Sequence, residues 1–110
     1  MDSLDLLRTA ASGMDAQRAA LDVFARNVAA SQAAGPKGSY ERLIPQFKLI
    51  GDGESAQVLF AGAVPQTEND GGILAEMVSV LNASRAYEAN ASVFEIGKHL
   101  AERTIDMGRL

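Results

Sequence analysis

Apolar and small side chains recur at helical spacing along the first third of the chain. They fall alternately three and four positions apart, and only Arg18 interrupts the series. Such spacing places them on one face of an α-helix. Asp2 or Ser3 can cap the start of this helix, and Gly35-Pro36 ends it, because proline cannot continue the hydrogen-bond ladder. The pattern predicts a helix over residues 3–34. Its expected packing positions are Leu4, Leu7, Ala11, Met14, Leu21, Ala25 and Val28.

The middle of the chain has a different pattern. YERLIPQFKLI (40–50) and AQVLFAGAV (56–64) are rich in β-branched, aromatic and other large apolar residues, and Gly51-Asp52-Gly53-Glu54 separates them. Two such runs around a Gly/Asp turn predict a β-hairpin. Pro45 lacks a backbone donor, so the first strand is expected at an edge or in a bulge. PQTENDGG (65–72) is a polar, turn-rich stretch and is expected to be a linker.

The last third of the chain repeats the helical spacing. No proline occurs in it, and Asn69 or Asp70 can cap the helix expected over residues 73–107. Its expected packing positions are Met77, Leu81, Tyr87, Ala91, Phe94, Ala101 and Ile105. We therefore predict a mainly α fold, with two long terminal helices packed as a helical hairpin or coiled coil around a small β-hairpin insertion. The parts 1–35, 36–72 and 73–110 are expected to form one structural unit.

Composition favours closely packed helices over a thick core. Apolar residues make up 47% of the 110 residues, but much of this is alanine, aromatic residues are only 5%, and tryptophan is absent. Two helices with a small hairpin bury little apolar surface, so the isolated chain is expected to be marginally stable and to gain order from its partners. No apolar run is long enough to span a membrane, and the acidic N-terminus does not resemble a secretory signal.

Several chemical functions lack the residues they need. The chain has no cysteine, one histidine and a net charge of −4, which disfavours thiolate chemistry, a metal centre and nucleic-acid binding. Glu95, His99 and Glu102 share a helical face, which is more often solvated than metal-binding. No Gly-x-Ser-x-Gly elbow occurs, and no Lys-Ser/Thr follows the glycine turn. We expect no catalysis, cofactor, metal ion or small-molecule substrate.

A few polar residues within the helices are candidates for specific contacts. Asn27 and Asn90 can fix helix register, as single polar residues do in coiled coils, or can simply be exposed. Arg85 and Glu88 can pair with neighbouring subunits, or with each other within the helix for about 0.2–0.5 kcal/mol.

Two strings in the terminal helices resemble motifs of a known family. AASGMDAQRAALDVFARNVA (10–29) is similar to the N-terminal motif of the axial proteins of the bacterial flagellum, which form its rod, hook and hook–filament junction. EMVSVLNASRAYEANASVF (76–94) is similar to the C-terminal motif of the proximal-rod subtype, and ASRAYEAN (83–90) is its most specific part. The chain departs from the family at Arg26 and Ala30, where asparagine is usual, and its middle is short for the subtype.

The resemblance implies a structural, non-catalytic role. Such proteins are exported through the flagellar type III apparatus without signal-peptide cleavage, and their terminal helices then pack as the inner layer of a tubular shaft. The proximal rod connects the membrane ring to the distal rod and hook across the periplasm, and it transmits torque. The implied partners are further copies of the chain, other rod subunits, the membrane-ring and rod-adapter proteins, and the export apparatus.

The residues alone also allow a different class of protein. A small secreted helical hairpin that acts as a binding module, or as a secretion-system partner, would show the same two amphipathic segments. Such a module is expected to be a stable monomer with a cooperative thermal transition and a one-to-one complex. A rod subunit is instead expected to have low helix content in isolation.

Overall fold

The computed structural model describes residues 3–35, 38–53, 56–66 and 72–108. The chain forms, in order, a long helix α1 (Ser3–Ala34), two strands β1 (Leu43–Ile50) and β2 (Gln57–Pro65), and a second long helix α2 (Gly72–Gly108). This is the mainly α fold expected from the sequence, with a hairpin between two long helices. In the described part of the chain, no helix is long and apolar enough to cross a membrane.

The helix ends show how the sequence delimits these elements. α1 stops at Ala34, and Gly35 follows with φ 76°, the left-handed conformation that glycine adopts at low cost. Asp5 lies in the first turn, where it faces the positive end of the helix dipole. The other expected end signals, Asp2, Pro36, Asn69 and Asp70, lie outside the described residues.

The two strands form an antiparallel hairpin with one irregularity. Leu43 pairs with Pro65 at the open end and Ile50 with Gln57 near the turn. The register shifts between Pro45 and Phe47, where a single residue of β1 faces two residues of β2. Gly62 supplies the positive φ (102°) at this point, as is common in β-bulges. Both strands of this two-stranded sheet are edge strands, so Pro45 lies at an edge as expected, and it borders a bulge whose extra residue is on β2.

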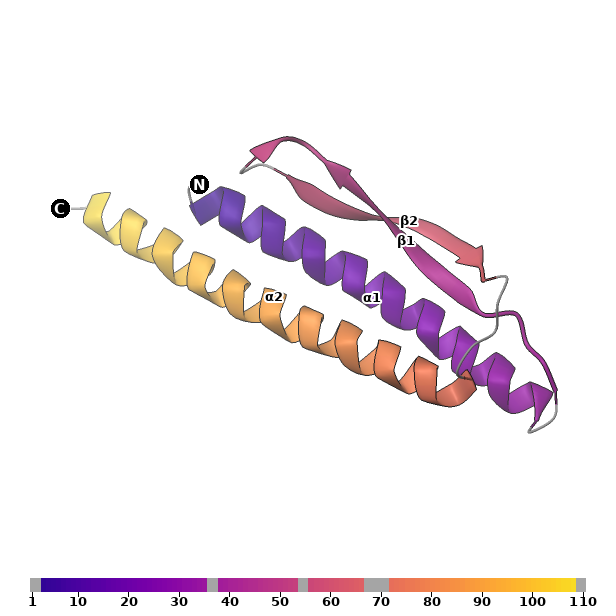
Figure 1. The fold of residues 1–110 in the computed structure, drawn as a ribbon. Coiled ribbons are helices and arrows are strands. Elements are labelled where there is room, and N and C mark those ends of the chain that lie inside the picture. The colour runs from indigo at the N-terminus through magenta and orange to yellow at the C-terminus, as the bar shows by residue number, and fades with distance from the viewer. Residues whose placement is uncertain (1–2, 36–37, 54–55, 67–71, 109–110) are drawn as a thin grey trace.

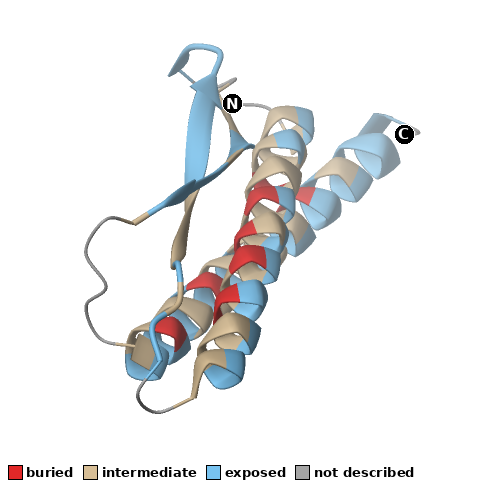
Figure 2. Cartoon of the chain, turned by 90° about the vertical axis from the view of Figure 1, so that its right-hand side faces the viewer, coloured by how far each residue is buried: buried red, intermediate tan, exposed pale blue. Residues whose placement is uncertain are grey.

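α1 is the central element of the molecule. Figure 1 shows α2 running antiparallel along one side of α1, while the twisted hairpin lies along another side. The molecule is elongated, with extents of 68 × 23 × 15 Å along its three principal axes. Figure 2 shows the buried residues in a narrow line between the two helices, and the hairpin is largely exposed. The core is correspondingly thin, and its buried apolar residues are Ala10, Ala16, Ala20, Val23 and Ala83.

The two helices meet in a regular register. Asn27 hydrogen-bonds Glu76, Gly13 lies against Asn90, and Gly97 lies against both Leu6 and Leu7. With Leu6 taken as the partner of Gly97, the two residue numbers in each pair add to 103, and successive pairs are seven residues apart on each helix. Ala20 and Ala83 fit the same rule, and both are buried. We call these four pairs the helix seam. It consists mostly of small and polar residues, which lets the two backbones come close together.

Gly13 is required by this close approach. A Cβ at this position would lie 2.7 Å from Oδ1 of Asn90, whose Nδ2 donates to Ala86 O at 2.9 Å. Asn90 therefore packs over the backbone of α1. This contact explains a glycine inside a helix, which costs about 1 kcal/mol relative to alanine.

A double-mutant cycle tests the contact between Gly13 and Asn90. Gly13→Ala alone is expected to leave the chain no more stable, because the new methyl group displaces Asn90. In an Asn90→Ala background the same change is expected to stabilise by about 1 kcal/mol, from helix propensity alone. Thermal unfolding in the presence of an osmolyte measures both effects. Asn82→Ala, an exposed change on α2, is the control background. Equal effects of Gly13→Ala in all three backgrounds would contradict the contact.

Candidate assembly surface

A buried polar cluster joins both helices to the start of the hairpin. The Asn27 side chain donates to Leu43 O at 2.8 Å and accepts from Leu43 N at 2.9 Å. Its Nδ2 also donates to Glu76 Oε2 at 3.1 Å. Asn27 thus pairs with the backbone of β1 as a neighbouring strand would, while it also binds α2. Among the residues that the structure describes, Asn27 and Glu76 are the largest fully buried side chains, at 1% and 0% exposure.

Arg42 supplies the charge that balances Glu76. Its Nε lies 2.5 Å from Glu76 Oε1, and its side chain is 11% exposed. This Nε–H makes no hydrogen bond of good geometry with any described residue, so the contact acts as an ion pair. The two Nη atoms donate to Gln66 Oε1 at 3.2 Å and Ser79 Oγ at 3.1 Å. Arg42 therefore ties the open end of the hairpin to α2. We call Asn27, Arg42, Leu43 and Glu76 the buried cluster.

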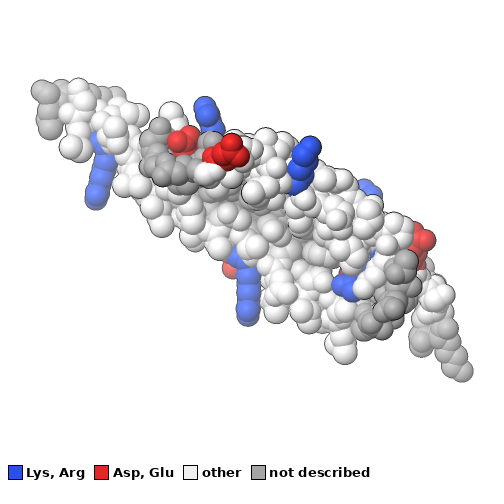
Figure 3. Space-filling view, turned by 45° about the horizontal axis from the view of Figure 1, so that its top comes forward, with Lys and Arg blue, Asp and Glu red and all other residues white. Residues whose placement is uncertain are grey.

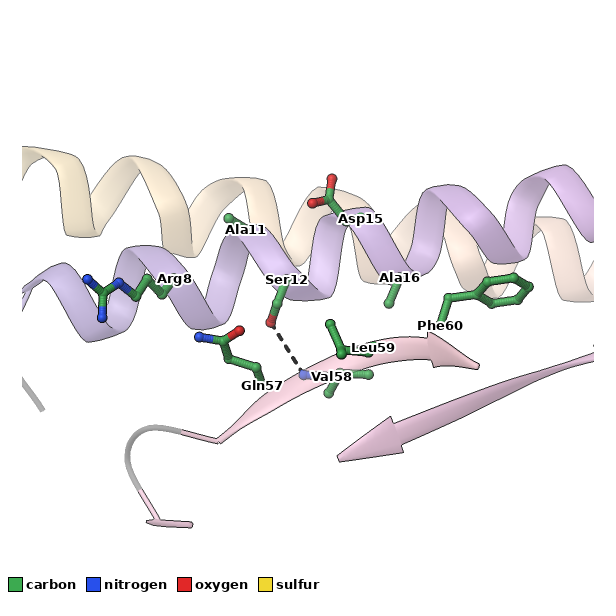
Figure 4. Close-up of a pocket in the computed structure, with 9 residues that line it drawn as sticks. All are labelled: Arg8, Ala11, Ser12, Asp15, Ala16, Gln57, Val58, Leu59 and Phe60. Atoms are coloured by element: carbon green, nitrogen blue, oxygen red, sulfur yellow. Dashed lines mark hydrogen bonds between the residues drawn. The ribbon is translucent and has the colours of Figure 1, made fainter. Parts of the chain in front are cut away.

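The other end of the hairpin is held by weaker contacts to α1. Ser12 Oγ accepts from Val58 N at 3.4 Å, and Thr9 Oγ1 donates to Ala56 O at 3.4 Å. Figure 4 shows Ser12 pointing from α1 to β2 beside a shallow cavity of about 330 Å³, whose rim includes Arg8 and Asp15. These bonds are long and partly exposed, so the hairpin is anchored mainly by the buried cluster.

A cation–aromatic pair links the helices at the edge of the seam. Arg18 Nη2 donates to Tyr87 Oη at 3.1 Å, and the guanidinium lies 5.8 Å from the centre of the Tyr87 ring. The hydrogen bond to Tyr87 and the electrostatic attraction between the two groups raise the pKa of Arg18 above its usual value. Arg18 thus interrupts the apolar series of α1 because it reaches across to α2.

A face of α2 that begins beside the seam is apolar near the N-terminal end of the helix. Leu74, Met77, Val78 and Leu81 are all more than half exposed. Together with other side chains they line an open groove of about 840 Å³, which we call the α2 groove; its residues are Val28, Leu74, Met77, Val78, Val80, Leu81 and Ser84. Such an apolar concavity on a small chain is typical of a protein–protein contact.

Charged side chains form no large patch of one sign on the view in Figure 3. Asp22 and Arg26 pair on the surface of α1 at 3.2 Å. His99 and Glu102 are 3.7 Å apart on exposed α2. No group of three potential metal ligands occurs among the residues that the structure describes.

The expected packing residues occupy several environments. Leu7, Met14, Leu21, Val28, Tyr87 and Phe94 are half-buried, as are Ala11, Ala91 and Ala101. Leu4, Ala25, Met77, Leu81 and Ile105 are exposed. None of these positions is fully buried, because the seam uses a neighbouring face of small residues. Their packing against other subunits stays a prediction.

The four polar residues that were expected to make specific contacts also lie in different environments. Asn27 lies in the buried cluster, and half-buried Asn90 covers Gly13. Arg85 and Glu88 are exposed on the same side of α2 as the α2 groove, so their contacts with neighbours stay a prediction. The sequence reasoning did not select Arg42 or Glu76. A signal was present in Glu76, Ala83, Asn90 and Gly97, which are spaced by seven; the first three match small or polar residues of α1 at the same spacing.

Comparison with known proteins points to one class of assembly. No protein-family model matches the chain. The flagellar basal-body rod protein FlgC of Aquifex aeolicus (strain VF5) is 27% identical over 130 residues, covering 96% of this chain and 97% of the relative. The similarity supports a flagellar rod protein. It therefore also supports a structural, non-enzymatic role in the basal body, in association with other rod components. The alignment exceeds 110 residues, so the relative carries residues that this chain lacks.

Proposed function

We propose that the chain is a structural subunit of the proximal rod of the bacterial flagellar basal body. The observation that carries this is the similarity to a rod protein along both terminal helices and the hairpin, not along one motif alone. The thin core and the exposed apolar face of α2 support it, since a shaft subunit completes its packing against neighbours.

In this role the two long helices pack with those of neighbouring subunits to form a shaft. The subunit is exported by the flagellar type III apparatus without a cleaved signal peptide, and it assembles in the periplasm with other rod subunits and the ring or adapter proteins. Helix–helix packing then transmits torque from the membrane ring to the distal rod and hook. The seam sets the register of the two helices, and the buried cluster fixes the hairpin at a constant angle to them.

Deletion of the gene tests this function in the bacterium that encodes the chain. The deletion strain is expected not to swim and to lack rods and hooks in electron micrographs, and a plasmid copy is expected to restore both. A plasmid copy of Gly13→Leu, which blocks the helix seam, should fail to restore them. Normal swimming of the deletion strain would contradict the proposal and favour a helical binding module instead.

A further inference from the structure

The bulge divides the hairpin into two parts. Residues 43–45 and 63–65 pair beside the buried cluster, and we call them the anchored part. Residues 47–50 and 57–60 pair toward the turn, and we call them the distal part. The register shifts between the two parts, so the hydrogen-bond ladder is disrupted there, and Gly62 lies at this point with a φ of 102°. The hairpin therefore has a natural place to bend.

The two parts are held to α1 with different strength. In the anchored part, both backbone groups of Leu43 bond to the Asn27 side chain, at 2.8 and 2.9 Å. In the distal part, Val58 N reaches Ser12 Oγ at 3.4 Å, and Thr9 Oγ1 reaches the residue before β2 at the same distance. Protein N–H···O bonds are usually about 2.7–3.2 Å long, so the distal bonds are weak. The distal part thus has little polar attachment to α1.

The apolar side chains of the distal part also pack loosely. Phe47 and Phe60 face each other across the strands, with ring centres 6.4 Å apart, and they remain 44% and 37% exposed. A cavity of about 280 Å³ lies beside Phe47, and the cavity of about 330 Å³ in Figure 4 lies beside Phe60. Segments with few buried contacts and weak hydrogen bonds open locally at a free energy well below that of global unfolding.

We propose that the distal part is a lid, which opens away from α1 about the bulge while the anchored part and both helices keep their places. The closed state is the one described above. Opening breaks the contact between Ser12 and Val58 and uncovers the strip of α1 beneath, where Ala16 lines the cavity and is only 2% exposed in the closed state. The constant angle between hairpin and helices is then a property of the anchored part alone.

Reactive thiols at chosen positions test the lid, because the chain has no cysteine of its own. Ala16→Cys places a thiol beneath the lid, and Ala83→Cys places one in the helix seam, where only unfolding uncovers it. Leu49→Cys, at a position that is 69% exposed, gives the rate of an unprotected thiol. Each purified chain reacts with dithiobis(nitrobenzoic acid) in a stabilising osmolyte, with and without low concentrations of urea.

The lid predicts two differences between the protected thiols. The thiol at position 16 is expected to react about tenfold or more faster than the thiol at position 83, since local opening needs less free energy than unfolding. Its rate should also rise less steeply with urea, because the urea dependence follows the surface area that is exposed. Both thiols should react more slowly than the thiol at position 49.

Two further substitutions separate opening from unfolding. Ser12→Ala removes a bond that opening breaks, so it is expected to speed the reaction at position 16 by about two- to tenfold, the ordinary effect of one hydrogen bond. Gln66→Ala removes a bond to Arg42 that stays formed when the lid is open. It is expected to speed the reaction at position 83 by a similar factor and to leave position 16 unchanged.

Three results would overturn the lid. They are equal rates and urea slopes at positions 16 and 83, an equal effect of Gln66→Ala at both, and a thiol at position 16 that reacts as fast as one at 49. If Ala16→Cys lowers the helical circular dichroism signal, amide hydrogen exchange of the unmodified chain decides instead. The Val58 N–H should then exchange faster than the Leu43 N–H, and equal rates would refute the lid. The gene-deletion strain tests the rod function separately.

Discussion

Glu76→Ala is expected to abolish most of the helical structure that the isolated chain adopts in a stabilising osmolyte. The change leaves the Arg42 guanidinium at 11% exposure without its carboxylate and removes one acceptor of Asn27. Breaking a buried ion pair in this way costs about 3–5 kcal/mol. Small domains have only about 5–15 kcal/mol of stability in total, and the thin core places this chain low in that range. Far-UV circular dichroism measures the loss of helix directly.

Two companion variants separate charge from packing. Glu95→Ala, an exposed change on the same helix, is expected to shift stability by no more than about 0.5 kcal/mol. The double change Arg42→Met with Glu76→Met removes both charges and keeps most of the volume, so it is expected to recover most of the helical signal. If Glu76→Ala unfolds no more readily than Glu95→Ala, the buried cluster does not hold the hairpin and helices together.

Replacing Val78 and Leu81 together by glutamine is expected to stop swimming without unfolding the subunit. Both side chains are more than half exposed, so the isolated fold loses little. In the shaft the same positions are expected to be covered by a neighbour. Burying an amide without a partner there costs about 1–3 kcal/mol at each position in every subunit. Swimming on soft agar, with micrographs of basal bodies, measures the effect.

The control for the strain with glutamine at positions 78 and 81 is a strain with Glu95→Gln, a polar change at another exposed position of α2. It should swim like the parent. The purified glutamine variant should keep the circular dichroism spectrum of the unmodified chain. A glutamine strain that assembles complete rods and swims normally would show that the groove stays uncovered in the assembly.

The outline of the fold could be predicted from the sequence because it depends on local signals. Helical spacing placed α1 at residues 3–34 and α2 within one residue at either end. Gly35 ended α1 through its left-handed conformation, and Pro45 marked the bulged part of the hairpin. Each of these features is decided by a few neighbouring residues, so one sequence suffices.

The helix seam and the buried cluster could not be predicted in the same way. The periodic pattern directs attention to large apolar residues, whereas the seam is built mostly on Gly13, Ala20, Ala83 and Gly97, together with two asparagines and one glutamate. The buried cluster joins residues near positions 27, 42 and 76, and no local pattern shows that these three will meet. Glu76 looks like an ordinary surface carboxylate until the register places it opposite Asn27.

The location of the chain in purified basal bodies tests whether it is part of the flagellar rod. A strain whose only copy carries a tag at an exposed position of the hairpin provides the material. We expect the chain to copurify with rods and hooks after detergent and salt extraction, and we expect antibody label between the membrane ring and the hook. Complete basal bodies without the chain, recovered from a swimming strain, would contradict this expectation.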